Sequence, residues 1–164
     1  VRRSAGGGQA VAVGEVEGVR KVTAQPGIRR YREACRFAEN AWFIRRDEPG
    51  YADLTPREIA QKMFSLADGC TFSAKKDAFA NIGGFLCTNN SKLAEQETNL
   101  LILTEGFPTY GGLAGRDLEA IAVGLEEVLQ PEYLEYRIAS TAYLGRHIAD
   151  HGVPIVEPPG GHAI

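Results

Sequence analysis

A pair of adjacent lysines stands where the residue types could support carbonyl chemistry. The string 73–77 reads Ser-Ala-Lys-Lys-Asp and follows residues 70–73, which have the pattern of a short strand. Ligands of open α/β sheets bind beyond the carboxyl ends of strands, so a lysine at this place faces a cleft more often than other lysines do. An amine forms an imine only when it is unprotonated, and a second cation together with partial burial lowers its pKa. Lys75 and Lys76 therefore indicate either a carbonyl-binding site or a solvated basic turn, and composition alone favours the turn.

Two neighbouring features of the same segment would suit such a site. The hydroxyl group of Ser73 could hold an anion. Gly83 and Gly84 have no side chain and would let a flat ring approach the backbone.

The elements that must position these residues alternate between short strands and amphipathic helices. Thr55 and Glu58 flank a first-turn proline in the order of a capping box, which predicts a helix from 56 to about 67. Further helices are expected at 10–24, 91–101, 113–129 and 132–151, and strands at 28–32, 70–73, 84–88 and from 153 to 156. The alternation predicts an α/β domain with a largely parallel sheet, although three arginines in 28–32 are poor residues for a buried parallel strand.

Composition limits the classes of function. The 164 residues carry a net charge of −3, so there is no overall basic excess that would favour nucleic acid, and no apolar stretch is long enough to cross a membrane. The three cysteines, Cys35, Cys70 and Cys87, have neither the spacing of a zinc ribbon nor a number that pairs completely, so reduced thiols in a cytoplasmic protein are expected. Both ends of the chain are interpreted as cuts through a larger protein.

Four stretches resemble one family of enzymes in the same order along the chain. The string 67–87, ADGCTFSAKKDAFANIGGFLC, closely resembles the cofactor-lysine segment of the aromatic amino-acid β-eliminating lyases, tryptophanase and tyrosine phenol-lyase. Similar matches are found at 39–44, 105–117 and 152–163. The resemblance covers about residues 5–164 and is far more specific than any single motif.

The resemblance implies a fold, a cofactor and a reaction. The fold would be three-layered α/β with a mainly parallel sheet, and residues 1–164 would be part of the large domain of the pyridoxal-phosphate-dependent aspartate-aminotransferase fold type. The reaction would be β-elimination of L-tryptophan to indole, pyruvate and ammonia; the alternatives are a tyrosine phenol-lyase activity or a non-catalytic remnant. The full-length family is expected to form a homo-tetramer and to bind a monovalent cation such as potassium. The chain alone is expected to be weak or inactive as a catalyst.

The same resemblance assigns roles to individual residues. Lys76 would bind the cofactor aldehyde, Lys75 would tune the nearby charge, and Ser73 would contact the phosphate. Glu33 would face the pyridine nitrogen and Arg36 the phenolic oxygen of the cofactor, whereas Asn81 would contribute to the cation site and Tyr110 and His162 would line the substrate side. For Tyr110 a packed turn aromatic is an equal alternative, and for His162 a solvated turn histidine.

Several residues depart from the family pattern toward the amino-terminal end. Glu33 stands where the family has aspartate, so its carboxylate is one methylene longer. Ser4 replaces an asparagine, and Arg30 and Arg32 replace apolar or aromatic residues in the strand that leads to Glu33. These departures predict weaker support for the cofactor ring.

Overall fold

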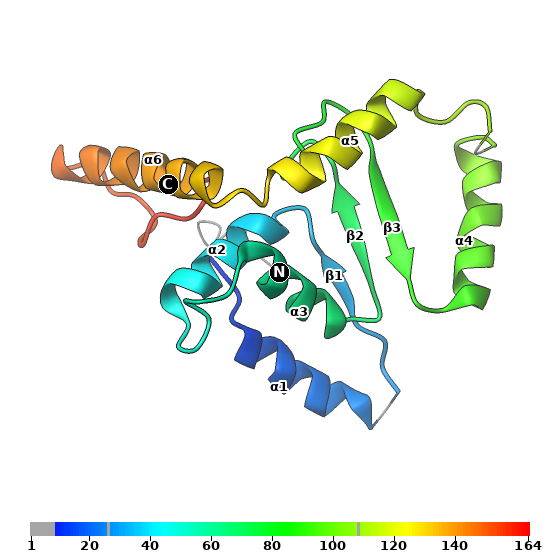
Figure 1. The fold of residues 1–164 in the computed structure, drawn as a ribbon, viewed down its shortest axis with the longest axis horizontal. Coiled ribbons are helices and arrows are strands. Elements are labelled where there is room, and N and C mark those ends of the chain that lie inside the picture. Colours follow the sequence, from blue (N-terminus) through cyan, green and yellow to red (C-terminus); the bar gives the residue numbers. More distant parts are fainter. Residues whose placement is uncertain (1–8, 26, 108) are drawn as a thin grey trace.

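The computed structural model describes residues 9–25, 27–107 and 109–164, and the expected Ser4 position lies outside these ranges. Helices surround a small sheet, with α6 extending away from it and the last residues folding back along α6 (Figure 1). In chain order the elements are α1 (Val13–Ala24), β1 (Tyr31–Glu33), α2 (Phe37–Asp47), α3 (Pro56–Ser65), β2 (Gly69–Ser73), β3 (Gly84–Thr88), α4 (Ser91–Thr104), α5 (Gly115–Glu127) and α6 (Pro131–Asp150).

The three described strands form a mixed sheet in the order β1-β2-β3. β1 and β2 are parallel, with Glu33 opposite Thr71, whereas β2 and β3 are antiparallel, with Ser73 opposite Gly84. The expectation of a mainly parallel sheet is therefore wrong for these strands. The physical reason is the connection of residues 74–83, which is too short for a crossover helix and closes a hairpin instead.

Helices cover one face of this sheet. Along β2, Cys70 and Phe72 are buried and Thr71, which points to the opposite face, is exposed. Phe72 and Ala34 pack with Ile121 of α5 in one apolar cluster. Burial thus marks two layers over the described strands, where three layers were expected, because no described helix buries the Thr71 face.

β1 begins three residues later than the strand expected at 28–32, and the arginines explain the shift. Arg30 precedes the strand and forms a two-pronged ion pair with Asp68, with nitrogen–oxygen distances of 2.9 and 3.1 Å. Arg32 lies within β1, where its guanidinium donates to the carbonyl of Met63 at 2.8 Å and lies over the ring of Phe64. Partial burial lowers the pKa of Arg32. These partners make arginine compatible with an edge strand.

The other predicted elements follow the expected pattern at most places. The capping box at the start of α3 is confirmed, because Thr55 and Glu58 hydrogen-bond reciprocally. Residues 153–156 form no strand in the structure, which corrects that expectation. α2 is a helix that the apolar periodicity does not predict, since its buried face includes the polar residues Glu39 and Asn40.

Phe37, at the start of α2, joins the apolar clusters of the molecule. Its ring lies 5.6 Å from that of Phe64 in α3 and 6.1 Å from that of Phe72 in β2, measured between centroids. Buried residues of α2 and α3, including Ile44 and Ile59, form a further apolar cluster against which Phe37 also packs. This packing fixes the amino-terminal end of α2 beside the strand ends.

No described helix is both long and apolar enough to span a bilayer.

Replacing Gly124 with alanine should destabilise the chain by about 1–3 kcal/mol. A Cβ atom at this position of α5 would overlap the backbone carbonyl oxygen of Ala78, which the helix contacts directly. Gly14→Ala in α1 is the matched control, because a Cβ there meets nothing within 4 Å and removes the glycine penalty, a gain of about 0.5–1 kcal/mol. Urea unfolding of both variants measures the difference, and equal midpoints would contradict the close helix–loop contact.

Candidate functional site

The carboxyl ends of β1 and β2 meet at one edge of the sheet, because the two strands are parallel. β1 ends at Glu33 and β2 at Ser73, and their register places these ends side by side. The chain then continues from β1 through Cys35 to Arg36 and from β2 through Lys75 to Lys76. The fold therefore brings together five of the residues that the sequence predicts for the site, namely Glu33, Arg36, Ser73, Lys75 and Lys76.

Lys76, rather than Lys75, lies on the inner side of this edge. The side chain of Lys75 is exposed, whereas Lys76 is half-buried and its amine hydrogen-bonds the thiol of Cys35. Cys35 is buried and free. Burial raises the pKa of its thiol to about 11, with a further contribution from the Glu33 carboxylate, while the Lys76 cation opposes the shift. Lys76, Cys35 and Glu33 thus form one contact group.

We expect Cys87 to be alkylated at least about tenfold faster than Cys35 at pH 8. Cys87 is exposed, whereas Cys35 is buried and its pKa of about 11 leaves a thiolate fraction about 100-fold below that of a thiol at the ordinary 9.0. Cys70 should also be slow, because burial first and Cys87 second raise its pKa to about 11. Timed iodoacetamide labelling with peptide mass spectrometry measures the three rates. Urea-unfolded protein is the control, in which all three should react alike, and equal rates in the folded protein would refute the placement.

The carboxylate of Glu33 turns back toward its own loop. Its Oε1 accepts a hydrogen bond from the backbone N–H of Cys35 at 3.2 Å, and the residue is exposed at the sheet edge. An aromatic nitrogen bound at the edge would have to replace or share this local contact.

The loop that carries Lys76 is held by its neighbours along the chain and in space. The N–H of Ala74 donates to the carbonyl of Gly83 at 3.0 Å, and the N–H of Phe79 donates to the carbonyl of Lys76 at 3.1 Å. Phe79 has a φ of 55°, which is rare for a residue other than glycine, and its ring packs edge-to-face on Tyr133 at 4.8 Å. Such strain persists only where the surroundings determine the conformation, so this loop has one defined shape.

A second group of charges surrounds Glu39, which is 3% exposed. Its Oε1 lies 3.3 Å from Arg36 and 3.8 Å from Arg137 of α6, and its Oε2 lies 3.3 Å from Nδ1 of His162. The segment that carries His162 packs back on α6, where Thr141 donates to the carbonyl of Gly161 at 3.3 Å. Through Glu39 the structure thus links two predicted site residues, Arg36 and His162, from distant parts of the chain.

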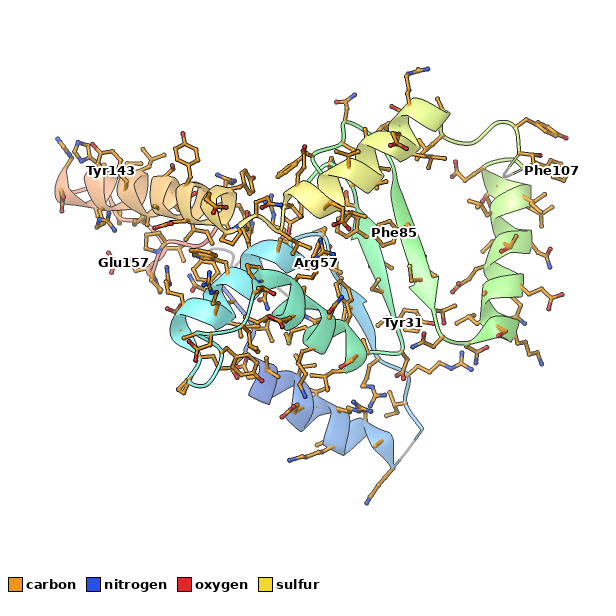
Figure 2. The ribbon with its side chains drawn as sticks, viewed as in Figure 1. Tyr31, Arg57, Phe85, Phe107, Tyr143 and Glu157 are labelled. Carbon is orange, nitrogen blue, oxygen red and sulfur yellow. The ribbon has the colours of Figure 1, made fainter. Side chains whose placement is uncertain are left out.

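The remaining predicted residues do not join the strand-end site. Tyr110 is 69% exposed, and its ring stacks on Phe107 at 5.2 Å. Figure 2 shows Phe107 beyond the end of α4, on the far side of β3 from β1. Asn81 is exposed in the loop before β3. The exposed ring of Tyr110 is not a packed turn aromatic, and its place on the substrate side stays a prediction.

A cavity of about 750 Å³ lies elsewhere, between α1 and the start of β1. Its lining contains none of the predicted site residues; the lining residues are Gln9, Ala10, Val11, Glu15, Val16, Val19, Arg30, Tyr31, Arg32, Leu66 and Ala67. It offers no amine, thiol or hydroxyl arranged for covalent chemistry other than the phenol of Tyr31. We place the candidate site at the strand ends because the reactive groups converge there.

Comparison with known families agrees with the chemistry of these groups. The family model described as Beta-eliminating lyase matches residues 3–163, nearly the whole chain. The chain belongs to the beta-eliminating lyase family. This match includes every residue that the sequence predicted for the site, from Glu33 to His162.

The individual relatives of the chain carry two kinds of name. The chain is 55% identical to a tryptophanase of Salinibacter ruber and 53% identical to one of Hyphomonas neptunium, each over its full 164 residues. It is 51% identical to a tyrosine phenol-lyase of Fusobacterium nucleatum over 158 residues, 96% of the chain. The chain spans about a third of the length of these curated relatives, 35%, 36% and 34% respectively.

Three further residues of this family member lie at or beside the candidate site although the sequence pattern did not single them out. Cys35 contacts Lys76, Asp77 anchors the lysine loop, and Glu39 bridges Arg36 and His162. Their proximity to predicted site residues in the sequence could have indicated them. Cys35 lies between Glu33 and Arg36, Asp77 directly follows Lys76, and Glu39 lies about one helical turn after Arg36. Only the fold shows that they face the site.

Proposed function

We propose that this chain is the lysine-bearing part of a pyridoxal-phosphate-dependent lyase that eliminates the side chain of an aromatic amino acid. The observation that carries the proposal is the position of Lys76. It follows β2 at the carboxyl edge of the sheet and interacts with Cys35, which also interacts with Glu33, in a chain about half identical to tryptophanases and tyrosine phenol-lyases.

The donor set at the strand ends fits the chemistry of pyridoxal phosphate. The amine of Lys76 can take its aldehyde, the carboxylate of Glu33 can pair with a protonated ring nitrogen, and the guanidinium of Arg36 can face an oxygen anion. The hydroxyl of Ser73 and the cation of Lys75 are suited to its phosphate. When bound, the cofactor ring supplies an electron sink for the substrate's α-carbon.

The chain's own residues then have separate tasks. The amine of Lys76 would hold the cofactor aldehyde and, when free, could take a proton from the α-carbon of the substrate. Lys75 adds a second positive charge at the same edge of the sheet. Oε1 of Glu33 accepts from the N–H of Cys35, so a ring nitrogen would have to share or replace this contact. The side chain is one methylene longer than aspartate, which places its carboxylate differently, and we expect this to weaken the electron sink.

Further features of the whole enzyme belong to the same proposal. We expect the large-domain fold of the aspartate-aminotransferase type, a homo-tetramer, a monovalent cation such as potassium near Asn81, and His162 on the substrate side. The three free thiols favour the cytoplasm as its compartment. L-Tryptophan is the preferred substrate, since the highest identities quoted above are to tryptophanases, and tyrosine is the alternative.

The proposal is tested by adding pyridoxal phosphate to the purified chain and reducing with borohydride. We expect a visible absorbance band that disappears on reduction, and a pyridoxyl group on the peptide that contains Lys76. Indole release from tryptophan and phenol release from tyrosine, measured in parallel, identify the substrate. A label spread evenly over exposed lysines would reject the proposal and favour a non-catalytic member of the family.

A further inference from the structure

The helix α2 begins without a cap of its own. The capping position is Arg36, whose side chain makes no capping hydrogen bond. The first backbone N–H groups of a helix have no acceptor within the helix, and a buried N–H without a partner is costly. Ala38, in the first turn, is 0% exposed, so water cannot satisfy its N–H.

The missing acceptor comes from the lysine loop. Oδ2 of Asp77 accepts a hydrogen bond from the N–H of Ala38 at 2.8 Å, and the residue is 3% exposed. In addition, the N–H of Asp77 donates to the carbonyl of Cys35 at 3.1 Å. A negative charge at the amino-terminal end of a helix is also favoured by the helix dipole. Asp77 therefore joins the loop after β2 to the start of α2 by two hydrogen bonds, one that its carboxylate accepts and one that its backbone N–H donates.

The contact between Asp77 and the start of α2 also affects the position of Lys76, the residue before Asp77 in the chain. Asp77 follows Lys76 directly, and Cys35 lies between Glu33 and Arg36. Fixing Asp77 against residues 35–38 fixes the backbone of Lys76 relative to the thiol of Cys35, with which its amine interacts. Exposed Lys75 lacks such a constraint.

We infer that Asp77 is a positioning residue, whose hydrogen bond to the start of α2 determines that Lys76 rather than Lys75 occupies the inner side of the site. This inference deepens the proposed function and rests on it for the identity of the cofactor. The contact itself requires no cofactor, so it can be tested in the cofactor-free protein.

The first test compares the reactivity of the two lysines without pyridoxal phosphate. Competitive labelling with acetic anhydride gives the ratio of acetylation at Lys76 to that at Lys75. In Asp77→Ala we expect this ratio to rise more than about threefold, because the loss of a charge-assisted hydrogen bond frees the loop. Asp77→Asn keeps an oxygen acceptor and should stay within about threefold of wild type. Asp53→Ala, an exposed aspartate before α3, is the matched control and should leave the ratio unchanged.

A purely structural role would loosen the whole chain, so the alkylation rate of buried Cys70 is measured in the same samples. It should not change in a folded Asp77 variant. A ratio that changes less than threefold in Asp77→Ala, or equally in Asp77→Asn and Asp77→Ala, overturns the inference. If Asp77→Ala does not fold, amide hydrogen exchange of the wild-type chain decides: the inference requires a protected Ala38 N–H, and an unprotected one overturns it.

Borohydride trapping with pyridoxal phosphate separates this inference from the proposed function. We expect the pyridoxyl label to move from Lys76 toward Lys75 in Asp77→Ala. A wild-type chain that takes no label on Lys76, together with an acetylation ratio that still responds to Asp77→Ala, would reject the cofactor and leave the positioning role intact. A label that stays on Lys76 in Asp77→Ala would reject the positioning role and leave the cofactor.

Discussion

Replacing Lys76 with arginine should reduce the borohydride-fixed pyridoxyl content from about one group per chain to background. The guanidinium of arginine stays protonated at all pH values at which proteins are folded, so it cannot add to an aldehyde as an amine does. The positive charge near Cys35 and Glu33 is retained, which keeps the electrostatics of the edge similar. Fluorescence of the reduced pyridoxyl group, with peptide mapping, measures the effect.

Lys75→Arg is the control for this result, because it changes the same type of side chain one residue away. Lys75 is exposed, and its replacement should leave the label on Lys76 unchanged. Loss of the label in Lys75→Arg but not in Lys76→Arg would show that Lys75 binds the cofactor and would refute the assignment to Lys76. Loss in both variants would mean that the pair acts as a unit.

Replacing Glu39 with alanine should destabilise the chain by about 3–5 kcal/mol, the cost of removing one partner from a buried charge group. The side chain of Glu39 is 4% exposed, and those of Arg36, His162 and Arg137 that face it are 22%, 12% and 36% exposed. Without the carboxylate, the arginines and a protonated His162 would face one another in a partly buried place. Urea unfolding followed by circular dichroism measures the loss.

The matched control is Glu127→Ala at the exposed end of α5, which should change the unfolding free energy by less than about 0.5 kcal/mol. Glu39→Gln separates charge from shape, because it retains the side-chain length and one acceptor oxygen. We expect it to lose less stability than the alanine variant. Equal stability of wild type and Glu39→Ala would show that this group does not hold α2, α6 and the carboxyl-terminal segment together.

Local signals in the sequence predicted most of the elements, because they depend on neighbouring residues. The capping box of α3 lies within four residues, and the hairpin strands β2 and β3 flank a short polar loop. By contrast, β1 begins at Tyr31 because Arg30 pairs with Asp68, a residue that is distant in sequence. The parallel or antiparallel sense of the strands also depends on which strands become neighbours, and periodicity does not carry that information.

Resemblance to a family marked Lys76, Glu33 and Arg36 in the sequence, and the structure places them at one edge of the sheet, whereas their roles stay predictions. Asp77 and Glu39 were not marked, because a charged residue in a sequence is most often solvated, and only the fold shows that both are buried. The substrate-side role of Tyr110 stays a prediction. In the structure its ring stacks on Phe107, away from the strand-end site (Figure 2).

The mixed sheet also has a consequence for the order in which the site assembles during folding. β2 and β3 join across the short connection 74–83, and Phe72 stacks on Phe85 with centroids 4.6 Å apart. β1 must close a much longer loop, residues 34–68, before it can pair, and the entropy cost of closure rises with loop length. The hairpin that carries Lys76 should therefore form first, and Glu33 and Arg36 should dock late. Substitutions in the hairpin would then mainly slow folding, whereas those in β1 would mainly accelerate unfolding.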